Sequence, residues 1–544
     1  MENQLPRVAY FCMEYGLDNN FKIYSGGLGI LAGDLLKAAK EQNKPVMGVG
    51  IKWKQGYTEQ RIDEQGNIYD CFRDYDYDFL VDTGVKVRVK IRQDEVYVKV
   101  WKANCFGNVD LYLLDTDLAE NKDRGITGRL YQGFTEERIA QEMVLGLGGV
   151  RALRALNLPV EIYHFNEGQA ALAGLELIRE KMESGKSFEE AWELTRQEVV
   201  FTTHTPIKAG NESHSLEALM YMGANLGLSI EQISQIGGVP FNMTVAALRL
   251  SKIANAVSKL HTETANRMWE KIENRAKIIG ITNGIHRRTW VDVRMSKNLL
   301  SLEEIRDNHR EMKKELIDFI EKRCGVRLSL EALLVGFSRR VAAYKRNDLL
   351  FKEEGRLEKY WKEGKIQVVF SGKAHPSDKE GKEIISTLVK IARRYPNSVI
   401  FLENYDMEIG KMLTRGCDVW LNTPRRPNEA CGTSGMKAAM NGVLNCSTLD
   451  GWWAEACQDG LNGWAIGDDV IPETVEEQDE KDARALYDTL LEKVIPTYYN
   501  CRQRWLEMMK ESIESTKTFF SMDRMLDDYY RLLYQEAQEA KVSF

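Results

Sequence analysis

Several absences in this sequence of 544 residues narrow its class. It contains no run of about 18 apolar residues, so we expect no helix that spans a membrane. The N-terminus, MENQLPRVAYF, lacks the basic-then-apolar pattern of a secretion signal. The nine cysteines form no C-x-x-C pair and are odd in number, which argues against a disulfide framework and against a metal site. These absences predict a reduced, cytoplasmic protein without a metal ion.

The charge balance also excludes a class of partner. Lys and Arg total 74 and Asp and Glu total 81, giving a net charge of -7, which is unfavourable for general nucleic-acid binding. A local basic cluster can still bind an anionic substrate against that net charge. With 43% hydrophobic and 28% charged residues, the chain resembles soluble globular proteins rather than disordered or fibrous ones. A large cytoplasmic enzyme is the simplest interpretation.

Short apolar runs alternate with amphipathic helical patterns in two series. The predicted strands of the first series are 8–14, 45–51, 160–166, 199–204 and 278–282, and its predicted helices include 30–42, 136–156 and 170–183. Residues 85–91 and 96–103 alternate apolar and polar residues, as in a hairpin. The predicted strands of the second series are 333–338, 366–371, 398–403, 418–422 and 442–447, with a helix at 378–394.

Strands that alternate with helices predict an α/β fold with parallel sheets. We expect two Rossmann-like, doubly wound domains in tandem, facing a cleft: residues 1–290, with the inserted hairpin, and residues 291–544. The helices at about 505–544 are expected to pack back on the first domain. Open parallel sheets bind ligands at the carboxyl ends of their strands, so polar motifs just after strands are the candidate sites.

Three such motifs lie in the first series. Gly26-Gly27-Leu28-Gly29 opens a helix, where glycine lets the backbone approach a ligand and the helix terminus favours an anion; a tight turn without a ligand is the alternative. His204 ends the strand VVFTTH and could bind a substrate, or be a neutral histidine satisfied by the backbone. Asn283 follows the strand IIGIT, where it suits sugar hydroxyls but also a common Asn-Gly turn.

A stronger signal follows the apolar run LLVGF of the second series. Arg339, Arg340, Lys345 and Arg346 lie directly after it, and Lys373 follows the next strand. A solvated charge run usually lies on a helix face or in a loop, not at the mouth of a buried strand. This arrangement favours a site for one or more phosphate groups.

The stretch Glu429–Lys437, EACGTSGMK, is the most informative one. Its glycines predict a turn whose backbone N–H groups could hold a phosphate at a helix start, although the spacing is not that of a P-loop. Lys437 could be a phosphate contact, a surface residue or an amine that forms a Schiff base. Trp452-Trp453 could stack on sugar, but we favour a place in the core.

Taken in order, these blocks resemble the glycogen (α-glucan) phosphorylase family. The stretch 429–437 is similar to that family's pyridoxal-phosphate attachment motif, and the resemblance continues through Asn441-Gly442 and Thr448–Gly451. It recurs at 26–29, at 282–285 with Trp290, at 339–346, at 371–374 and at 402–405. The resemblance implies the GT-B type of glycosyltransferase architecture, with pyridoxal 5'-phosphate in the second domain and the glucan on the side of the first.

The resemblance also implies the reaction: reversible phosphorolysis of terminal α-1,4-linked glucosyl units to glucose 1-phosphate, with retention. The phosphate of pyridoxal phosphate would relay protons to the substrate phosphate. Lys437 would hold the cofactor as an internal Schiff base. The other residues implied around the cofactor are Thr433 and Ser434, through their backbone N–H groups, together with Arg339, Trp290 and Gly27.

The resemblance implies that Lys437, Arg340, Lys345 and His204 are the catalytic residues. Arg340 and Lys345 would bind the substrate phosphate, and His204 and Asn283 the 6-hydroxyl of the glucosyl unit. The full set implied to bind substrates is Gly26, Gly27, Leu28, Gly29, His204, Asn283, Arg340, Lys345, Glu429, Cys431 and Gly432. The implied partners are α-glucan, inorganic phosphate and glucose 1-phosphate, without nucleic acid or membrane, and a homo-oligomer is compatible with the resemblance.

Some positions depart from the family pattern. Cys431 stands where the family has Ser, Ser434-Gly435 replaces Gly-Asn, Arg339 stands where Lys is usual, and Asp406 stands where the larger enzymes carry Arg. The sequence begins almost directly at its first predicted strand, so we do not expect the N-terminal regulatory segments of larger members. Two other functions stay open: a nucleotide-sugar glycosyltransferase of the starch or glycogen synthase type, and a non-catalytic glucan-binding protein.

Overall fold

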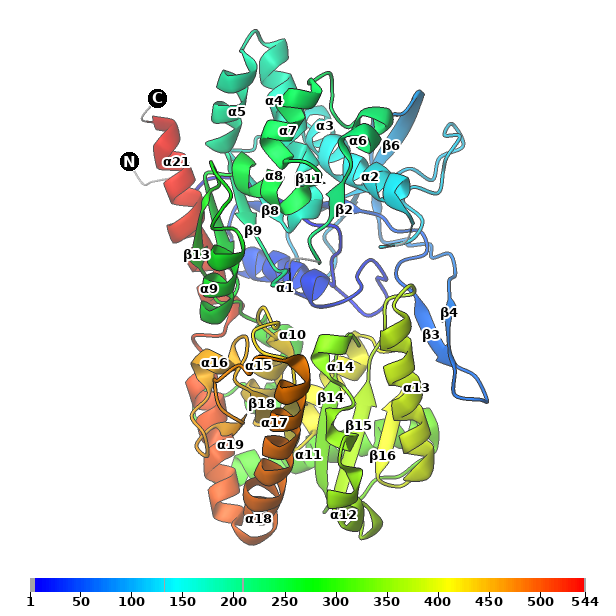
Figure 1. Ribbon diagram of the computed structural model, residues 1–544, viewed down its shortest axis with the longest axis vertical. Coiled ribbons are helices and arrows are strands. Elements are labelled where there is room, and N and C mark those ends of the chain that lie inside the picture. The colour runs from blue at the N-terminus through cyan, green and yellow to red at the C-terminus, as the bar shows by residue number, and fades with distance from the viewer. Residues whose placement is uncertain (1–4, 132, 208–209, 543–544) are drawn as a thin grey trace. The chain divides into compact units, whose positions relative to one another are not determined.

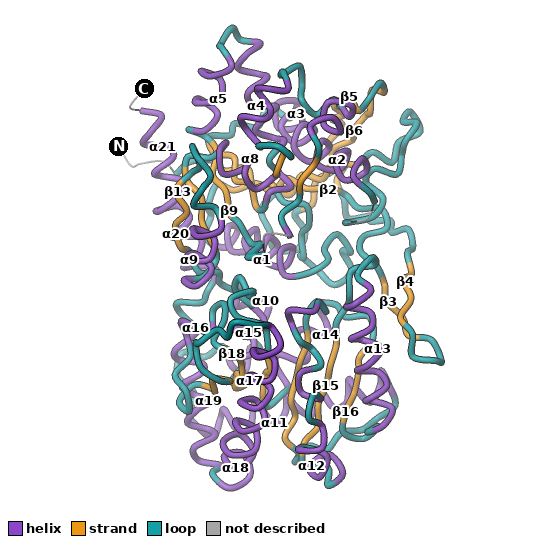
Figure 2. Tube along the Cα trace, viewed as in Figure 1, coloured by secondary structure: helices purple, strands orange, loops and turns teal. Residues whose placement is uncertain are grey.

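The computed structural model describes residues 5–131, 133–207 and 210–542, which group into two compact units. Unit 1 comprises the described residues of 5–57, 72–282 and 522–542, and unit 2 comprises 58–71 and 283–521. Each unit is an α/β structure with one main sheet, and Figure 2 shows helices around the strands of each.

The main sheet of unit 1 has nine strands in the order β13-β12-β9-β8-β1-β2-β7-β6-β5. Neighbours from β13 to β7 are parallel, and β6 and β5 add an antiparallel hairpin at one edge. The strands are β1 (Val8–Phe11), β2 (Val46–Ile51), β5 (Val81–Ile91), β6 (Asp94–Ala103), β7 (Leu111–Asp115), β8 (Ile162–Asn166), β9 (Val199–Thr202), β12 (Ile253–Ala256) and β13 (Lys277–Gly280).

The main sheet of unit 2 has six parallel strands in the order β16-β15-β14-β17-β18-β19. The strands are β14 (Leu333–Ser338), β15 (Ile366–Ser371), β16 (Val399–Leu402), β17 (Val419–Asn422), β18 (Leu444–Thr448) and β19 (Gly463–Ile466). The chain builds outward from β14 to β16 and then crosses to β17 on the other side of β14. This is the doubly wound order, with its switch point between β14 and β17. In unit 1 the same reversal falls between β1 and β8.

Helices follow most strands, as in βαβ units. Those of unit 1 are α1 (Gly27–Glu41), α2 (Thr135–Met143), α3 (Gly149–Ala155), α4 (Leu172–Glu183), α5 (Phe188–Arg196), α6 (Leu216–Met222), α7 (Ile230–Gly237), α8 (Met243–Leu250), α9 (Lys259–Met268), α20 (Met522–Tyr529) and α21 (Gln535–Val542). Those of unit 2 are α10 (Arg287–Trp290), α11 (Leu302–Cys324), α12 (Glu358–Lys362), α13 (Lys379–Arg394), α14 (Met407–Gly416), α15 (Thr433–Met440), α16 (Trp453–Ala456), α17 (Val475–Asp488), α18 (Ile495–Asn500) and α19 (Arg502–Thr516) (Figure 1).

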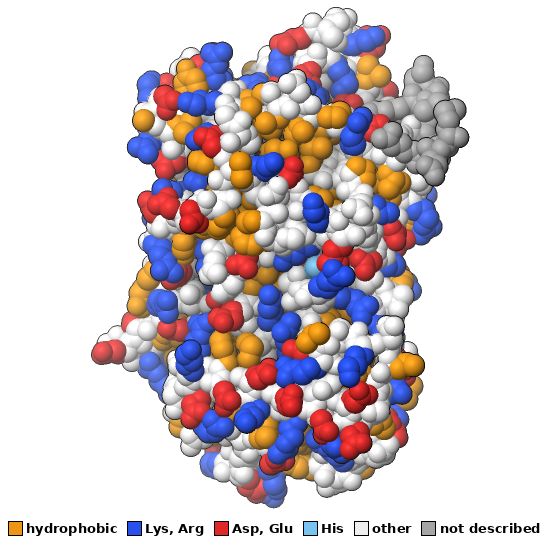
Figure 3. All heavy atoms as spheres, turned by 180° about the vertical axis from the view of Figure 1, so that it is seen from behind, with side chains coloured by type: hydrophobic (Ala, Val, Ile, Leu, Met, Phe, Trp, Pro, Cys, Tyr) orange, Lys and Arg blue, Asp and Glu red, His pale blue; other side chains and the backbone are white. Residues whose placement is uncertain are grey.

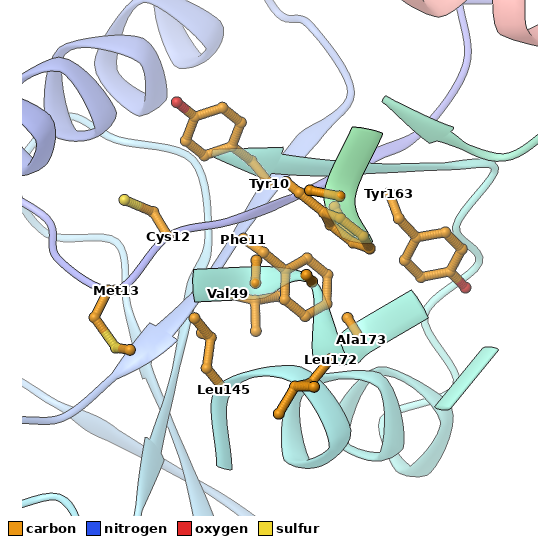
Figure 4. Packing of buried hydrophobic residues seen from close by; sticks show 14 of the residues in the cluster. Tyr10, Phe11, Cys12, Met13, Val49, Leu145, Tyr163, Leu172 and Ala173 are labelled. Carbon is orange, nitrogen blue, oxygen red and sulfur yellow. The ribbon is translucent and has the colours of Figure 1, made fainter. Parts of the chain in front are cut away.

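The core of unit 1 explains its apolar strands. Strands β1 and β8 are buried along their whole lengths, as strands of parallel sheets covered on both faces are. The Phe11 ring lies 6.2 Å from the Phe165 ring in an edge-on arrangement. Val49, Leu145 and Leu172 belong to the same cluster, which Figure 4 shows from close by.

Two segments join a unit from a distance in the sequence. The short hairpin of β3 (Glu59–Ile62) and β4 (Ile68–Cys71) belongs to unit 2, where Gln60 Nε2 donates to the Ala374 carbonyl at 2.8 Å. At the other end of the chain, the Tyr534 hydroxyl lies 2.8 Å from His164 Nδ1 of β8 in unit 1. Helix α19, in contrast, belongs to unit 2.

The units therefore differ from the expected ranges 1–290 and 291–544 at three places: 58–71, 283–290 and 522–542. That the chain folds as two separate domains stays a prediction. Among the described residues, no helix combines the length and the apolar character that crossing a membrane requires. Basic and acidic side chains are interspersed over the face seen in Figure 3, in line with their near balance in the sequence.

Candidate functional site

A cluster of charged side chains lies at the switch point of the unit 2 sheet. Arg339 directly follows β14, and its guanidinium donates to the side-chain oxygen of Asn422, the last residue of β17. The other end of the guanidinium is paired with the Glu429 carboxylate. Ligands of doubly wound sheets bind at this point because the helices after β14 and β17 leave in opposite directions.

Lys345 binds the same carboxylate. Its ammonium lies 3.0 Å from each oxygen of Glu429, and both side chains are buried. Burial by itself favours the neutral acid, but the charges of Arg339 and Lys345 outweigh it and hold the pKa of Glu429 at about 2. The cluster is therefore two cations and one permanent anion in the physiological range.

Asp450 fixes the backbone beneath this cluster. One of its oxygens accepts the Glu429 N–H at 2.9 Å, and the other accepts the Gly451 N–H at 2.8 Å. Burial, and then the Glu429 charge, raise the pKa of Asp450 to about 8, so the group is mostly protonated at pH 7. This role of Asp450 was not predicted, although the residue lies two positions after the end of β18 (Leu444–Thr448).

A backbone hydrogen bond joins the loop before α15 to the loop after β18. The Trp452 N–H donates to the Cys431 carbonyl at 2.8 Å, and Gly451 has a φ of +53°. A Cβ on Gly451 would lie 2.3 Å from that carbonyl oxygen, so only glycine fits there. Trp452 and Trp453 are each 1% exposed, which confirms that both belong to the core rather than to a sugar platform.

Helix α15 starts at this loop. Gly432, its N-cap residue, has a left-handed backbone with a φ of +86°, which glycine adopts without strain. Thr433 and Ser434 are the first helical residues, so their N–H groups have no acceptor within the helix. The Ser434 hydroxyl accepts from the Trp420 indole N–H at 3.3 Å. This local structure agrees with the predicted turn and helix start.

Lys437 lies one turn further along α15, where it is buried against an indole ring. Its ammonium is 3.3 Å from the ring centroid of Trp290. The side chain of Asn441 links the backbones of these two residues. Its amide donates to the Lys437 carbonyl at 2.8 Å and to the Trp290 carbonyl at 3.2 Å. Arg415 also donates to the Trp290 carbonyl, at 3.1 Å. Lys437 is thus not a surface residue, which removes one of the three interpretations of this lysine.

The remaining cations of the motif take different places. Arg340 is exposed. Arg346 is buried and bound to Asp479 at 2.9 Å and Asp482 at 2.6 Å, and it also donates to backbone carbonyls. That Arg346 joins the anion site stays a prediction, and in the structure its guanidinium is paired with these carboxylates and carbonyls. Asp406 caps α14 by accepting the Ile409 N–H at 3.0 Å.

In unit 1, the glycine motif 26–29 opens α1 as predicted, with Gly26 as the N-cap residue. A carboxylate already lies against this turn. Glu14 accepts the backbone N–H groups of Ser25 at 2.6 Å and Gly26 at 3.1 Å, and it accepts the Tyr131 hydroxyl at 2.7 Å. A Cβ on Gly29 would lie 2.6 Å from a Glu14 oxygen, which explains the glycine there. Glu14 is the last residue of the predicted strand 8–14, and nothing in the sequence pattern indicates this contact.

His204 lies at the carboxyl end of the same sheet. Its Nε2 is 2.6 Å from Asn166 Oδ1, which can only accept, so Nε2 carries the proton. Burial, and then the neighbouring His261, lower the pKa of His204 to about 3. The imidazole is therefore neutral at pH 7. The His204 backbone N–H donates to Glu167 at 3.0 Å.

Asn283 is buried and belongs to unit 2, close in sequence to Ile285, whose N–H donates to the Phe520 carbonyl at 2.9 Å. The structure thus brings Arg339, Lys345, Glu429, Cys431 and Gly432 together in unit 2. His204 and the glycine motif lie in unit 1.

Unit 1 also contains a cluster of charged side chains that was not predicted from the sequence. Glu142, Glu212 and His214 bring three potential metal-ligand atoms within 4.8 Å of one another. Arg138 binds both oxygens of Glu212, at 2.9 and 2.7 Å, and His214 Nε2 lies 2.8 Å from Glu142. These pairings already compensate the acidic charge, so the cluster is explained as part of the structure.

Comparison with known proteins decides the family. Residues 294–460 match the family described as carbohydrate phosphorylase, and residues 7–268 match the starch synthase catalytic domain. The maltodextrin phosphorylase of Thermococcus litoralis is 38% identical to this chain, over 97% of this chain and 70% of that protein. This chain belongs to the carbohydrate phosphorylase family.

Other phosphorylases agree with this assignment. The glycogen phosphorylase of Aquifex aeolicus is 36% identical over 97% of this chain and 86% of that protein. The glycogen phosphorylase of Mycobacterium tuberculosis is 35% identical, with coverages of 98% and 71%. These findings confirm the predicted family, the α/β fold with two doubly wound sheets and the class of glycosyl-transferring enzyme.

Proposed function

We propose that this phosphorylase family member is an α-glucan phosphorylase. It catalyses reversible phosphorolysis, in which inorganic phosphate takes the terminal α-1,4-linked glucosyl unit of a glucan and glucose 1-phosphate is released with retention. The observation that carries this proposal is the cluster of Arg339, Lys345 and Glu429 at the switch point of the unit 2 sheet. A partly buried and a buried cation at that point favour a phosphate, and phosphate is the co-substrate that separates a phosphorylase from a hydrolase.

The residues around Lys437 fit pyridoxal 5'-phosphate as the cofactor. A buried amine beside an indole ring supports attachment of an aromatic aldehyde, and the first N–H groups of α15 suit a phosphate. The Nε of Arg339 is buried and has no hydrogen-bond partner among the described residues, which leaves it a donor for an anion. When bound, the cofactor would supply a phosphate that exchanges protons near neutral pH.

The chain's own residues would divide the work as follows. Lys437 would hold the cofactor, with Thr433 and Ser434, Arg339, Trp290 and Gly27 as further contacts. Arg340 and Lys345 would bind the substrate phosphate and balance its charge as the transition state forms. Because Arg340 is exposed, it is suited to meeting an incoming ion, whereas the buried Lys345 acts in a place of lower dielectric constant.

The sugar would be bound mainly by hydrogen bonds to hydroxyl groups. Glu429 and the backbone of Cys431 and Gly432 would contact the glucosyl unit. His204 and Asn283 would bind its 6-hydroxyl; because the Nε2–H of His204 donates to Asn166, its Nδ1 would accept from that hydroxyl. The substitution of Cys431 for Ser weakens a side-chain contact but leaves the backbone one. Gly26–Gly29 would contribute backbone groups to the phosphate.

One comparison favours a second candidate, a nucleotide-sugar glycosyltransferase, because residues 7–268 match the starch synthase catalytic domain. The two candidates differ in their donor. The phosphorylase needs inorganic phosphate and glucan, whereas the synthase needs ADP-glucose or UDP-glucose. A glucan-binding protein without activity would turn over neither.

The deciding assay incubates the purified protein with maltoheptaose and inorganic phosphate and measures glucose 1-phosphate. We expect product that depends on phosphate, with no transfer from ADP-glucose or UDP-glucose in a parallel reaction. Incorporation from a nucleotide sugar without phosphorolysis would establish the second candidate. Glucan binding without either reaction would leave only the binding protein.

A further inference from the structure

Glu429 makes unusual contacts for a residue expected to bind sugar. Both of its oxygens lie 3.0 Å from the Lys345 ammonium, and one is also paired with Arg339. These are the two cations that the proposed function gives to phosphate groups. The carboxylate is thus bound as an anion by the phosphate-binding residues.

The carboxylate also lies at the start of α15. A Cβ placed on Gly432 would be 3.7 Å from Glu429 Oε1 and 3.6 Å from its carboxyl carbon, so the acid packs over the N-cap residue. A helix start and two cations together form a favourable environment for a phosphate. Glu429 occupies that environment with a single negative charge.

A phosphate dianion cannot simply be added to this arrangement. Like charges at contact distance repel, and a dianion is repelled by the carboxylate more strongly than a single charge is. The Glu429 backbone is held by Asp450 at 2.9 Å, and Trp452 holds the Cys431 carbonyl at 2.8 Å. With the loop fixed in this way, rotation of the side chain is the available response.

We propose that Glu429 is an internal counter-anion that couples phosphate binding to sugar binding. When phosphate binds Lys345 and Arg339, the ion pairs of these two cations with Glu429 break. The two oxygens of the released carboxylate no longer contact Lys345 or Arg339. They then accept hydrogen bonds from hydroxyl groups of the glucosyl unit. This inference rests on the proposed function, and it adds that each ligand tightens the binding of the other.

The test uses the purified enzyme with its own cofactor and two ligands that cannot react together. Calorimetry measures the dissociation constant of 1,5-anhydroglucitol, a glucose ring without an anomeric hydroxyl, in the absence and presence of saturating inorganic phosphate. We expect phosphate to tighten sugar binding about tenfold, within the range of 5- to 150-fold typical of coupled sites. In Glu429→Gln this ratio should fall to about one, while phosphate alone binds more tightly than in the wild type.

The matched control is Glu331→Gln, which removes an exposed carboxylate of unit 2 paired with Arg310 at 2.7 Å, and it should keep the wild-type ratio. A ratio of one in the wild type would overturn the inference without any variant. An unchanged ratio in a folded Glu429→Gln protein would do the same. Phosphorolysis without coupling removes only this inference, whereas absence of phosphate-dependent turnover removes the proposed function.

Discussion

Replacing Lys437 by alanine is expected to lower phosphorolysis by about 10³-fold or more while the fold is retained. The loss should exceed the 10²- to 10³-fold typical of removing one stabilising group, because the amine proposed to anchor the whole cofactor is removed. Stability should change little in comparison. An ammonium over an aromatic ring contributes about 0.5–2 kcal/mol, and Lys437 is 3.3 Å from the Trp290 ring centroid. Initial rates of glucose 1-phosphate formation and the far-ultraviolet circular dichroism spectrum measure the two effects.

Lys411→Ala is the matched control for this variant. Its ammonium lies 5.8 Å from the centroid of the same Trp290 ring, but it extends from α14 rather than α15. We expect it to keep both the cofactor and the activity. Wild-type phosphorolysis by Lys437→Ala without added cofactor would contradict the role given to this lysine.

Replacing Asp418 by alanine is expected to destabilise unit 2 by about 3–5 kcal/mol. Asp418 is buried and accepts hydrogen bonds from Lys313 at 2.6 Å, His309 at 3.0 Å and the Leu334 N–H at 2.8 Å. Without it, the Lys313 ammonium stays buried with no counter-charge. Hydrogen exchange of peptides from β14 and β17 measures the loss as a lower free energy of opening, which avoids a two-state treatment of the whole chain.

The effect should also depend on pH. Burial favours the neutral acid, but Lys313 and His309 outweigh it and hold the pKa of Asp418 at about 2. The carboxylate therefore stabilises the fold above about pH 4, and this contribution is lost as the pH falls towards 2. The difference between wild type and Asp418→Ala should shrink over that range. Asp318→Ala, which removes an exposed carboxylate paired with Arg327 at 3.1 Å, should cost at most about 1 kcal/mol. Equal losses in the two variants would contradict this account.

Much of the fold could be predicted because parallel strands covered on both faces are continuous apolar runs. The ranges 333–338 and 366–371 agree with β14 and β15 residue for residue, and the predicted hairpin corresponds to β5 and β6. Strand β12, with the sequence IANA, was missed because it is short and half of its residues are small alanines. The assignment of 58–71 to unit 2 depends on contacts with α13 and its loop, which no local pattern encodes.

In the candidate site, too, local patterns predicted some features, whereas others depend on tertiary contacts. Motifs after strands predicted that Arg339, Lys345 and Glu429 lie close together, and in the structure the two cations contact this carboxylate, because carboxyl ends of neighbouring parallel strands meet at one edge. Charge alone could not separate Lys345 from Arg346, whose partners Asp479 and Asp482 lie more than 130 residues further along the chain. The carboxylate of Glu14 was missed although it precedes Ser25 and Gly26 by only 11 and 12 residues, because no local pattern shows that the chain turns back onto it. Which carboxylates each cation binds is a property of the tertiary structure.

The most direct test of the central claim is to map the group attached to Lys437. The purified protein is reduced with sodium borohydride and digested, and its peptides are analysed by mass spectrometry. We expect a pyridoxyl phosphate group on the peptide that contains Lys437 and none on the peptide that contains Lys411. An unmodified Lys437 peptide, from protein that retains a nucleoside diphosphate and transfers glucose from a nucleotide sugar, would contradict the assignment.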